Sequence, residues 1–234
     1  MLLLTVAAPV LGTNCYLLAV EGGHECIIVD PGIGLDDKVD EGMAEYGLRP
    51  AAVLITHGHL DHTFSLAQLC RRHELPVYIH EADAYRLADP LGTVSPEFAH
   101  LFAPLADDWT PPSDVRPLRD GAELDLAGLE ISVIGAPGHT EGSVFYYVHA
   151  PDPSASADLC FTGDVLFAGT IGRTDLPGGD AAAMAMSLAG IAHPASEGGL
   201  PDNTTVLPGH GEPSTIGRER ATNPFLKDLG SRSG

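Results

Sequence analysis

The stretch Val53-Leu54-Ile55-Thr56-His57-Gly58-His59-Leu60-Asp61-His62 joins an apolar run to three histidines and an aspartate. A short apolar run of this kind is typical of a buried strand. Side chains alternate along extended backbone, so His57 and His59 are expected on the same side. Asp61 and His62 then open a helix beside them. Imidazole and carboxylate groups are ligands of zinc and similar divalent ions, so the stretch predicts a strand that ends at a metal site.

Three more apolar runs end in a potential ligand. His139 follows residues 131–138, Asp164 follows residues 159–163, and His210 follows residues 205–209. In α/β folds, binding sites are built at strand ends that a buried sheet holds in place. A lone histidine at a strand end is more often structural. Here, however, His139, Asp164 and His210 occur in the same chain as the motif at residues 56–62. Together they predict that the motif and the three strand ends meet at one metal site.

Two further polar residues follow apolar runs and are assigned supporting roles. His80 comes after residues 77–79 and is expected to be structural or to support a ligand from outside the metal site. Asp30 comes after residues 27–29 and is expected to brace a turn next to the site.

Composition excludes several classes of partner. The chain has 234 residues, of which 44% are hydrophobic, enough for a sizeable core. Its 32 acidic residues against 12 basic ones give a net charge of −20, which argues against binding to nucleic acid or to an anionic membrane. The four cysteines form no CxxC pair and are expected to be reduced thiols. With no basic signal-peptide start and no long apolar run, the sequence predicts a cytoplasmic protein.

Strand-like and helix-like segments alternate, which predicts an α/β fold. A single domain is expected over residues 1–229, followed by a flexible tail at 230–234. Closely spaced prolines between residues 92 and 119 predict an irregular, lid-like loop. Its aromatic and apolar residues either line a substrate pocket or pack the loop against the core. These residues are Phe98, Leu101, Phe102 and Trp109. The expected strands are 15–20, 26–30, 51–56, 77–79, 129–135, 143–148, 159–162 and 204–207; the expected helices are 35–46, 61–73, 180–191 and 214–229.

The motifs resemble those of a known family. The heptapeptide at residues 56–62, Pro137-Gly138-His139-Thr140, Phe161-Thr162-Gly163-Asp164 and Gly209-His210-Gly211 resemble, in order and spacing, the metallo-β-lactamase superfamily. Segments 171–175 and 215–226 are similar to its short type II glyoxalase-like (hydroxyacylglutathione hydrolase-like) branch. The resemblance implies an αββα sandwich of two mixed β-sheets with helices on the outer faces.

The resemblance also implies a set of metal ligands. In the family pattern, His57, His59 and His139 hold the first metal. Asp61, His62 and His210 hold the second, and Asp164 bridges both. The implied cofactors are two divalent ions, with zinc expected and iron or manganese as alternatives. Asp61 and Asp164 are also the expected catalytic residues.

The implied activity is that of a binuclear metallohydrolase. The expected reaction is cleavage of S-2-hydroxyacyl-thiols, such as S-lactoylglutathione, by a metal-bound hydroxide, with a small-molecule thioester as the substrate. A mononuclear iron persulfide dioxygenase and a lactonase of the same superfamily remain alternatives. Arg173 and Arg218 are candidate substrate contacts, and with Arg220 they would make the mouth of the site electropositive. A structural pairing of Arg173 with Asp175 is the alternative role for this residue, and the thiol carrier and the oligomeric state stay open.

Overall fold

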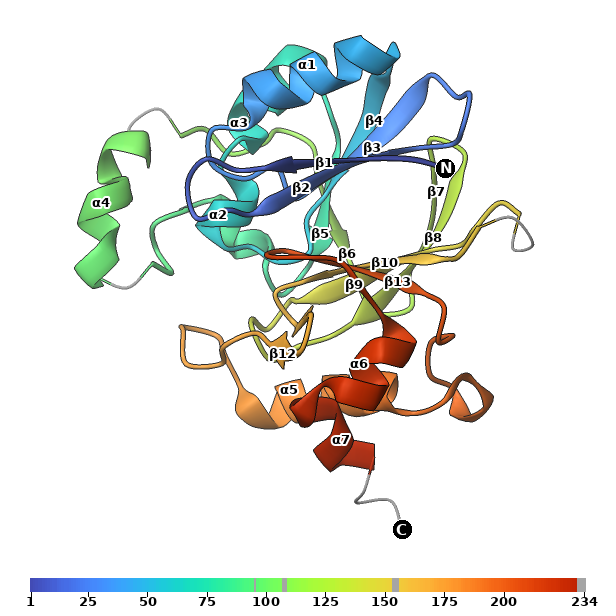
Figure 1. Ribbon diagram of the computed structural model, residues 1–234. Helices are drawn as coiled ribbons and strands as arrows, with labels where there is room; N and C mark the ends of the chain where they lie inside the picture. Colours follow the sequence, from blue (N-terminus) through green and yellow to red (C-terminus); the bar gives the residue numbers. More distant parts are fainter. Residues whose placement is uncertain (95, 107–108, 153–155, 231–234) are drawn as a thin grey trace.

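The computed structural model describes residues 1–94, 96–106, 109–152 and 156–230, and its two large β-sheets pack face to face between helices (Figure 1). The first sheet has six strands in chain order, antiparallel from β1 to β3 and parallel from β3 to β6. These are β1 (Leu2–Ala7), β2 (Asn14–Ala19), β3 (Glu25–Val29), β4 (Arg49–Leu54), β5 (Val77–His80) and β6 (Val115–Leu118).

The second sheet also has six strands, in the order β14-β13-β10-β9-β8-β7, with β10 and β13 parallel. These are β7 (Glu123–Leu126), β8 (Leu129–Gly135), β9 (Val144–Val148), β10 (Leu159–Gly163), β13 (Thr205–Pro208) and β14 (Ser214–Thr215). A small hairpin of β11 (Leu166–Phe167) and β12 (Thr170–Ile171) follows β10.

Helices cover the outer face of each sheet. The helices on the first-sheet half are α1 (Asp36–Tyr46), α2 (Leu60–Thr63), α3 (Leu66–His73), the 3-10 turn η1 (Ala84–Leu87) and α4 (Pro96–Ala106). Those on the second-sheet half are α5 (Ala181–Ala192), η2 (Ala195–Glu197), α6 (Ile216–Thr222) and α7 (Pro224–Gly230). The αββα sandwich expected from the sequence is therefore confirmed.

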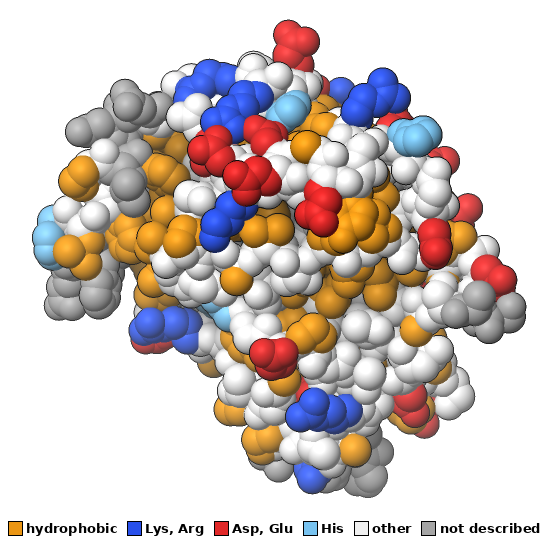
Figure 2. All heavy atoms as spheres, turned by 45° about the horizontal axis from the view of Figure 1, so that its top comes forward, with side chains coloured by type: hydrophobic (Ala, Val, Ile, Leu, Met, Phe, Trp, Pro, Cys, Tyr) orange, Lys and Arg blue, Asp and Glu red, His pale blue; other side chains and the backbone are white. Residues whose placement is uncertain are grey.

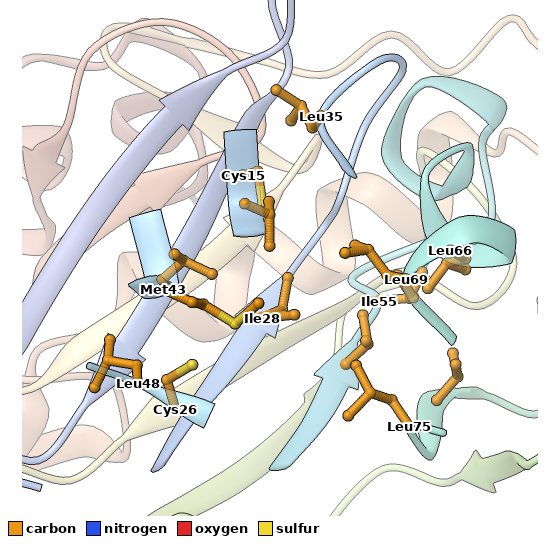
Figure 3. Close-up of a cluster of buried hydrophobic side chains, with 14 of the residues drawn as sticks. Cys15, Cys26, Ile28, Leu35, Met43, Leu48, Ile55, Leu66, Leu69 and Leu75 are labelled. Atoms are coloured by element: carbon orange, nitrogen blue, oxygen red, sulfur yellow. The ribbon is translucent and has the colours of Figure 1, made fainter. Parts of the chain in front are cut away.

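Three hydrophobic layers hold the sandwich together. The outer layer on the first sheet joins α1 and α3 to the strands and includes Met43 of α1, Leu69 of α3 and Ile28 of β3 (Figure 3). The layer between the sheets includes Tyr16 and Phe161, whose ring centroids lie 5.2 Å apart. A third layer joins α5 to the second sheet. Burial of this much apolar surface is the main stabilising contribution to such a fold.

The expectation of an irregular loop between residues 92 and 119 is wrong in part, because α4 and β6 form within it. Pro96 is the first residue of α4, where a missing N–H costs no helical hydrogen bond, and Pro104 lies in the last turn. Trp109 packs on Phe64, with ring centroids 5.7 Å apart, and donates to the Leu87 carbonyl. Trp109 thus packs its segment against the body. The side chain of Phe98 lies outside the described residues.

Two expected helices are each split in the structure. The helix expected at 61–73 is divided into α2 and α3. The helix expected at 214–229 ends at Thr222, because Pro224 disfavours helical backbone at Asn223 before α7 begins. Residues 231–234 lie outside the described part of the chain, so the single domain with a flexible tail stays a prediction.

The surface mixes both signs of charge in spite of the acidic composition. Acidic and basic side chains lie side by side over the helices of the first sheet (Figure 2), where Arg72 pairs with Asp36, Asp37 and Asp40. Within the described residues, no helix is long and apolar enough to cross a membrane. All four cysteines are free thiols, as expected, and three of them are buried.

Candidate metal centre

The two sheets bring seven polar side chains to one edge of the sandwich. His57 and His59 follow β4, and Asp61 and His62 lie in α2 directly after them. Three strand ends of the second sheet supply the remaining residues, which are His139, Asp164 and His210. The structure therefore gathers all seven residues that the motifs single out.

The first ligand group consists of His57, His59 and His139. Each offers a ring nitrogen, and these atoms lie within 4.8 Å of one another. The three rings stand nearly perpendicular to each other, with centroids 4.6 to 4.8 Å apart. Rings that converge edge to face point several nitrogens at one spot, which suits a tetrahedral ion.

The second ligand group consists of Asp61, His62 and His210. Its ligand atoms also lie within 4.8 Å of one another, with His210 Nε2 at 3.2 Å from Asp61 Oδ2. Asp164 lies between the two groups, because its Oδ2 is 3.7 Å from His139 Nε2 and 3.5 Å from His210 Nε2. Its other oxygen is 3.4 Å from His62 Nε2. One carboxylate thus reaches both groups.

Four side-chain atoms of these seven residues are buried and have no hydrogen-bond partner among the described residues. They are the Nε2 atoms of His57, His59 and His62 and the Oδ1 atom of Asp164. A buried polar atom without a partner costs free energy, so its presence calls for an explanation. Converging imidazole and carboxylate atoms fit one or two divalent ions of the zinc or iron type.

Contacts from outside the cluster orient the rings. Asp30 Oδ2 lies 3.0 Å from His62 Nδ1 and also accepts from the Thr56 hydroxyl. The Arg173 carbonyl oxygen lies 2.8 Å from His139 Nδ1. When the Nδ1 atom of a ring is held in this way, its Nε2 atom faces the metal position, an arrangement common at zinc sites. The supporting role expected for Asp30 is confirmed by these contacts.

Burial and mutual charge perturb the pKa values at the centre. Burial, with help from His139, lowers the pKa of His59 to about 3. Burial would likewise lower the pKa of His62, but the carboxylates of Asp164, Asp61 and Asp30 outweigh it and raise that pKa. Burial would raise the pKa of Asp61, yet neighbouring His62 and His210 hold it below its ordinary value. Neutral imidazole and ionised carboxylate are the forms that bind metal, so His59 and Asp61 are held in ligand-competent forms, whereas a metal ion that binds His62 must displace its proton.

Glycines allow the backbone to crowd this centre. Gly163 precedes Asp164 with φ of +47°, a left-handed conformation that favours glycine. A Cβ atom on Gly209 would overlap Asp164 Oδ1 and lie 2.6 Å from His62 Cε1. The glycine before His210 therefore lets β13 approach both ligand groups.

The centre opens on the side of the second ligand group. The side chains of His210, Asp61 and Asp164 are 29%, 19% and 13% exposed, while those of His57, His59, His62 and His139 are buried. A substrate reaching the cluster would therefore meet His210 and Asp61 first.

The three candidate arginines lie in different settings. Arg173 is exposed and makes two hydrogen bonds to Asp175, at 2.6 and 2.7 Å. Arg218 lies in the first turn of α6, with its backbone N–H donating to Thr215. The Arg220 side chain donates to the carbonyls of Ile191 and Leu200 and pairs with Asp202. The expectation that Arg220 lines the mouth is therefore wrong, because its guanidinium ties α6 to the segment after α5.

Sequence reasoning missed two residues and correctly set one aside. His80 Nδ1 accepts from the Ala82 N–H in its own turn, and His80 belongs to neither ligand group. Thr13 donates to Asp61 Oδ2 at 3.2 Å from a turn in the first sheet, which no local pattern signals. Asp83, three residues after His80, contacts both ligand-bearing loops. The pattern of an apolar run followed by a polar residue points to His80 and does not extend to Asp83.

Comparison with known proteins agrees with the fold and the cluster. Residues 8–210 match the metallo-β-lactamase superfamily. The chain is 34% identical over 215 residues to the hydroxyacylglutathione hydrolase GloC of Haemophilus influenzae, covering 91% of this chain and 92% of that protein.

Two solved structures are also similar over almost their full length. The crystal structure of the BLEG-1 B3 metallo-β-lactamase has a TM-score of 0.79 and 32% identity, covering 96% of this chain and 99% of that one. The crystal structure of TTHA1623 in a di-iron-bound form has a TM-score of 0.75 and 36% identity, covering 95% and 99%. The fold and the His/Asp cluster define a metallo-hydrolase. The chain belongs to the metallo-β-lactamase superfamily.

Proposed function

We propose that the protein is a metal-dependent thioesterase that cleaves S-2-hydroxyacyl-thiols of the S-lactoylglutathione type. The observation that carries the proposal is the cluster itself, in which seven metal-binding side chains converge and four of their buried atoms lack a hydrogen-bond partner among the described residues. The 34% identity to GloC, a hydroxyacylglutathione hydrolase, supports the substrate class.

The first ligand group would hold one divalent ion and the second ligand group another, and Asp164, which reaches both groups, would contribute to each. Two such ions, when bound, lower the pKa of a water molecule and polarise a carbonyl group. Zinc is the proposed metal, with iron or manganese as alternatives, and the di-iron form of TTHA1623 shows that a similar protein binds iron.

The chain's own residues would orient the reactants. Asp61 lies at the open side of the centre, and we propose that its carboxylate helps to orient the attacking water. Asp164 reaches both ligand groups and fixes their separation. A thiolate leaving group needs little protonation, so this reaction requires no separate general acid. Arg173 and Arg218 are proposed to bind the anionic thiol carrier.

The proposal is tested by loading the protein with zinc and measuring hydrolysis of S-lactoylglutathione together with metal content. We expect two ions per chain and thioester turnover that a chelator abolishes. The variants His139→Ala and Asp164→Ala should lose metal and at least about a thousandfold in turnover, since several kcal/mol of stabilisation depends on the ions. Turnover that persists after metal removal would overturn the proposal.

Hydrolysis of a cyclic amide is a second candidate, because a B3 metallo-β-lactamase has a similar structure. The same assay should therefore include a chromogenic cephalosporin, a lactone, and glutathione persulfide with detection of sulfite under oxygen. Thioester turnover well above the other three would favour the thioesterase. Oxygen consumption with one iron per chain would favour a persulfide dioxygenase.

A further inference from the structure

A buried carboxylate outside the cluster links the loops of the first ligand group. Asp83 directly precedes η1 and is fully buried. Its Oδ2 accepts from the Gly58 N–H and from the Thr140 hydroxyl, both at 2.7 Å. Its Oδ1 accepts from the Gly142 N–H and from Arg86 Nε, both at 3.1 Å. Four donors thus meet on one side chain.

Three of these donors, on Gly58, Thr140 and Gly142, belong to the two loops that carry all three residues of the first ligand group. Gly58 lies between His57 and His59, and Thr140 directly follows His139. Since these histidines come from different sheets, the Asp83 carboxylate is a direct link between the two halves of this group.

Glycines let Asp83 and its turn fit between the loops. A Cβ atom on Gly58 would lie 2.6 Å from Arg86 Cδ, and one on Gly142 would lie 2.7 Å from Asp83 Cβ. Real Cβ atoms do not approach so closely, so even the smallest side chain at either position would push the η1 turn away. The close packing of the η1 turn against the two loops therefore depends on Gly58 and Gly142 as well as on Asp83.

Arg86 keeps this carboxylate paired inside the protein. Arg86 is 1% exposed, and besides Asp83 it contacts Glu141 and the Pro177 carbonyl. A buried ion pair contributes little net stability, because desolvation of both charges offsets their attraction. Such a pair at the base of two ligand loops indicates a positional role for Asp83.

A different carboxylate serves the second ligand group. Asp30 accepts from the Thr56 N–H at 2.8 Å and contacts His62 Nδ1. Asp83 contacts the loops of His57, His59 and His139, whereas Asp30 contacts the His62 ring directly and reaches His57 through Thr56, whose hydroxyl lies 3.2 Å from His57 Nδ1. Of the two buried aspartates, Asp83 therefore acts on the first group, and Asp30 acts most directly on the second.

We propose that Asp83 is a positioning residue that sets the geometry of the first ligand group, and thereby its metal affinity, independently of the second. The inference rests on the metal site of the proposed function but not on its substrate. It predicts that a change at Asp83 weakens the first metal position and leaves the second unchanged.

The test compares Asp83→Asn with Asp30→Asn in the full chain. An asparagine has one acceptor oxygen and turns an NH2 group toward two of the four donors, so the link is broken without loss of volume. We expect zinc affinity at the first group to fall about 10- to 100-fold, as for other residues that orient ligands, with the second group unchanged. Asp30→Asn should weaken the second group most, because Asp30 contacts His62 directly.

The readout is zinc occupancy at each position at limiting zinc, measured by anomalous diffraction and by shifts of the histidine ring nitrogens in NMR, without substrate. The inference would be overturned if Asp83→Asn weakened zinc binding equally at both positions or weakened it at neither. Because no substrate is used, failure of thioester hydrolysis leaves this result intact. A wild-type chain that binds no zinc or iron would overturn the proposed metal site and this inference together.

A second pair of variants guards against misfolding of Asp83→Asn. Thr140→Val removes one of the four hydrogen bonds and keeps the buried Asp83–Arg86 pair, and Thr140→Ser restores the hydroxyl. We expect Thr140→Val to lower first-group affinity selectively, by less than Asp83→Asn, and Thr140→Ser to recover it. Unchanged affinity in Thr140→Val would contradict the inference even if Asp83→Asn fails to fold.

Discussion

His139 Nδ1 lies 2.8 Å from the backbone carbonyl oxygen of Arg173, so Arg173 supports the candidate metal centre through its main chain. Its side chain is 60% exposed, and its guanidinium pairs with Asp175. The two parts of this residue can therefore be tested separately, because a side-chain substitution leaves the carbonyl in place.

Arg173→Ala should raise KM for S-lactoylglutathione about tenfold, with kcat and metal content unchanged. A hydrogen bond to a charged group contributes about 1.5 kcal/mol, which corresponds to a factor of ten. Steady-state kinetics checks this, with Arg116→Ala as the control, since Arg116 is a surface arginine paired with Asp114. An unchanged KM would mean that the Arg173 side chain serves only Asp175.

Gly209→Ala should reduce bound metal below two ions per chain without removing any ligand. The added Cβ would overlap Asp164 Oδ1 and press on His62, and overpacking of this kind costs about 1–3 kcal/mol. Gly190→Ala in α5 is the matched control, because its Cβ meets nothing within 4 Å. Elemental analysis that finds two ions in Gly209→Ala would show that the strand can shift to make room.

Glu219→Ala should lower the free energy of unfolding by about 1–3 kcal/mol, because it leaves buried donors without a partner. The buried Glu219 carboxylate accepts from the Gly169 N–H at 2.8 Å and from Asn223 Nδ2 at 2.9 Å, and so holds the β11–β12 hairpin to α6. Glu219→Gln keeps an acceptor oxygen and should cost less. Urea denaturation measures both, and equal losses would argue that packing dominates over hydrogen bonding.

Asp40→Asn should destabilise the protein at neutral pH but not at low pH. Partial burial would raise the pKa of Asp40, but His73 and Arg72 hold it below its ordinary value. A carboxyl with a lowered folded-state pKa contributes stability above its unfolded pKa of about 4, and this is lost as pH falls through the folded value.

The loss of unfolding free energy in Asp40→Asn is up to about 1 kcal/mol at pH 7, since the ion pairs of Asp40 with Arg72 and His73 face solvent. Thermal unfolding of Asp40→Asn and wild type at pH 7 and at about pH 3 measures it, with Glu45→Gln on the same helix as the control. A difference that persists at the lower pH would assign the effect to packing instead of charge.

The sequence predicted most of the strands and the cluster because both depend on local signals. Apolar runs mark the strands, and His57, His59, Asp61 and His62 lie within six positions of one another. The structure brings the seven side chains together as expected, and their role as metal ligands stays a prediction. Helix α4 was missed because prolines obscure helical periodicity even at positions that tolerate them.

Contacts across the fold could not be predicted in the same way. Asp83 reaches Thr140 over 57 positions, and Thr13 reaches Asp61 over 48. Neither residue belongs to a motif, and their partners are set by the packing of the two sheets. Such residues emerge only when the strands have been placed in space.

The origin of the seven side chains has a consequence for how long the protein survives. Four of them follow β4 in the first sheet and three follow strands of the second. Ions held between them would link the two sheets of the sandwich. The stability that they add would depend on the free metal concentration, since the unfolded chain lacks the site. Proteases act on transiently opened chains. The rate at which the protein is degraded would then depend on the metal supply, and molecules without bound metal would be degraded first.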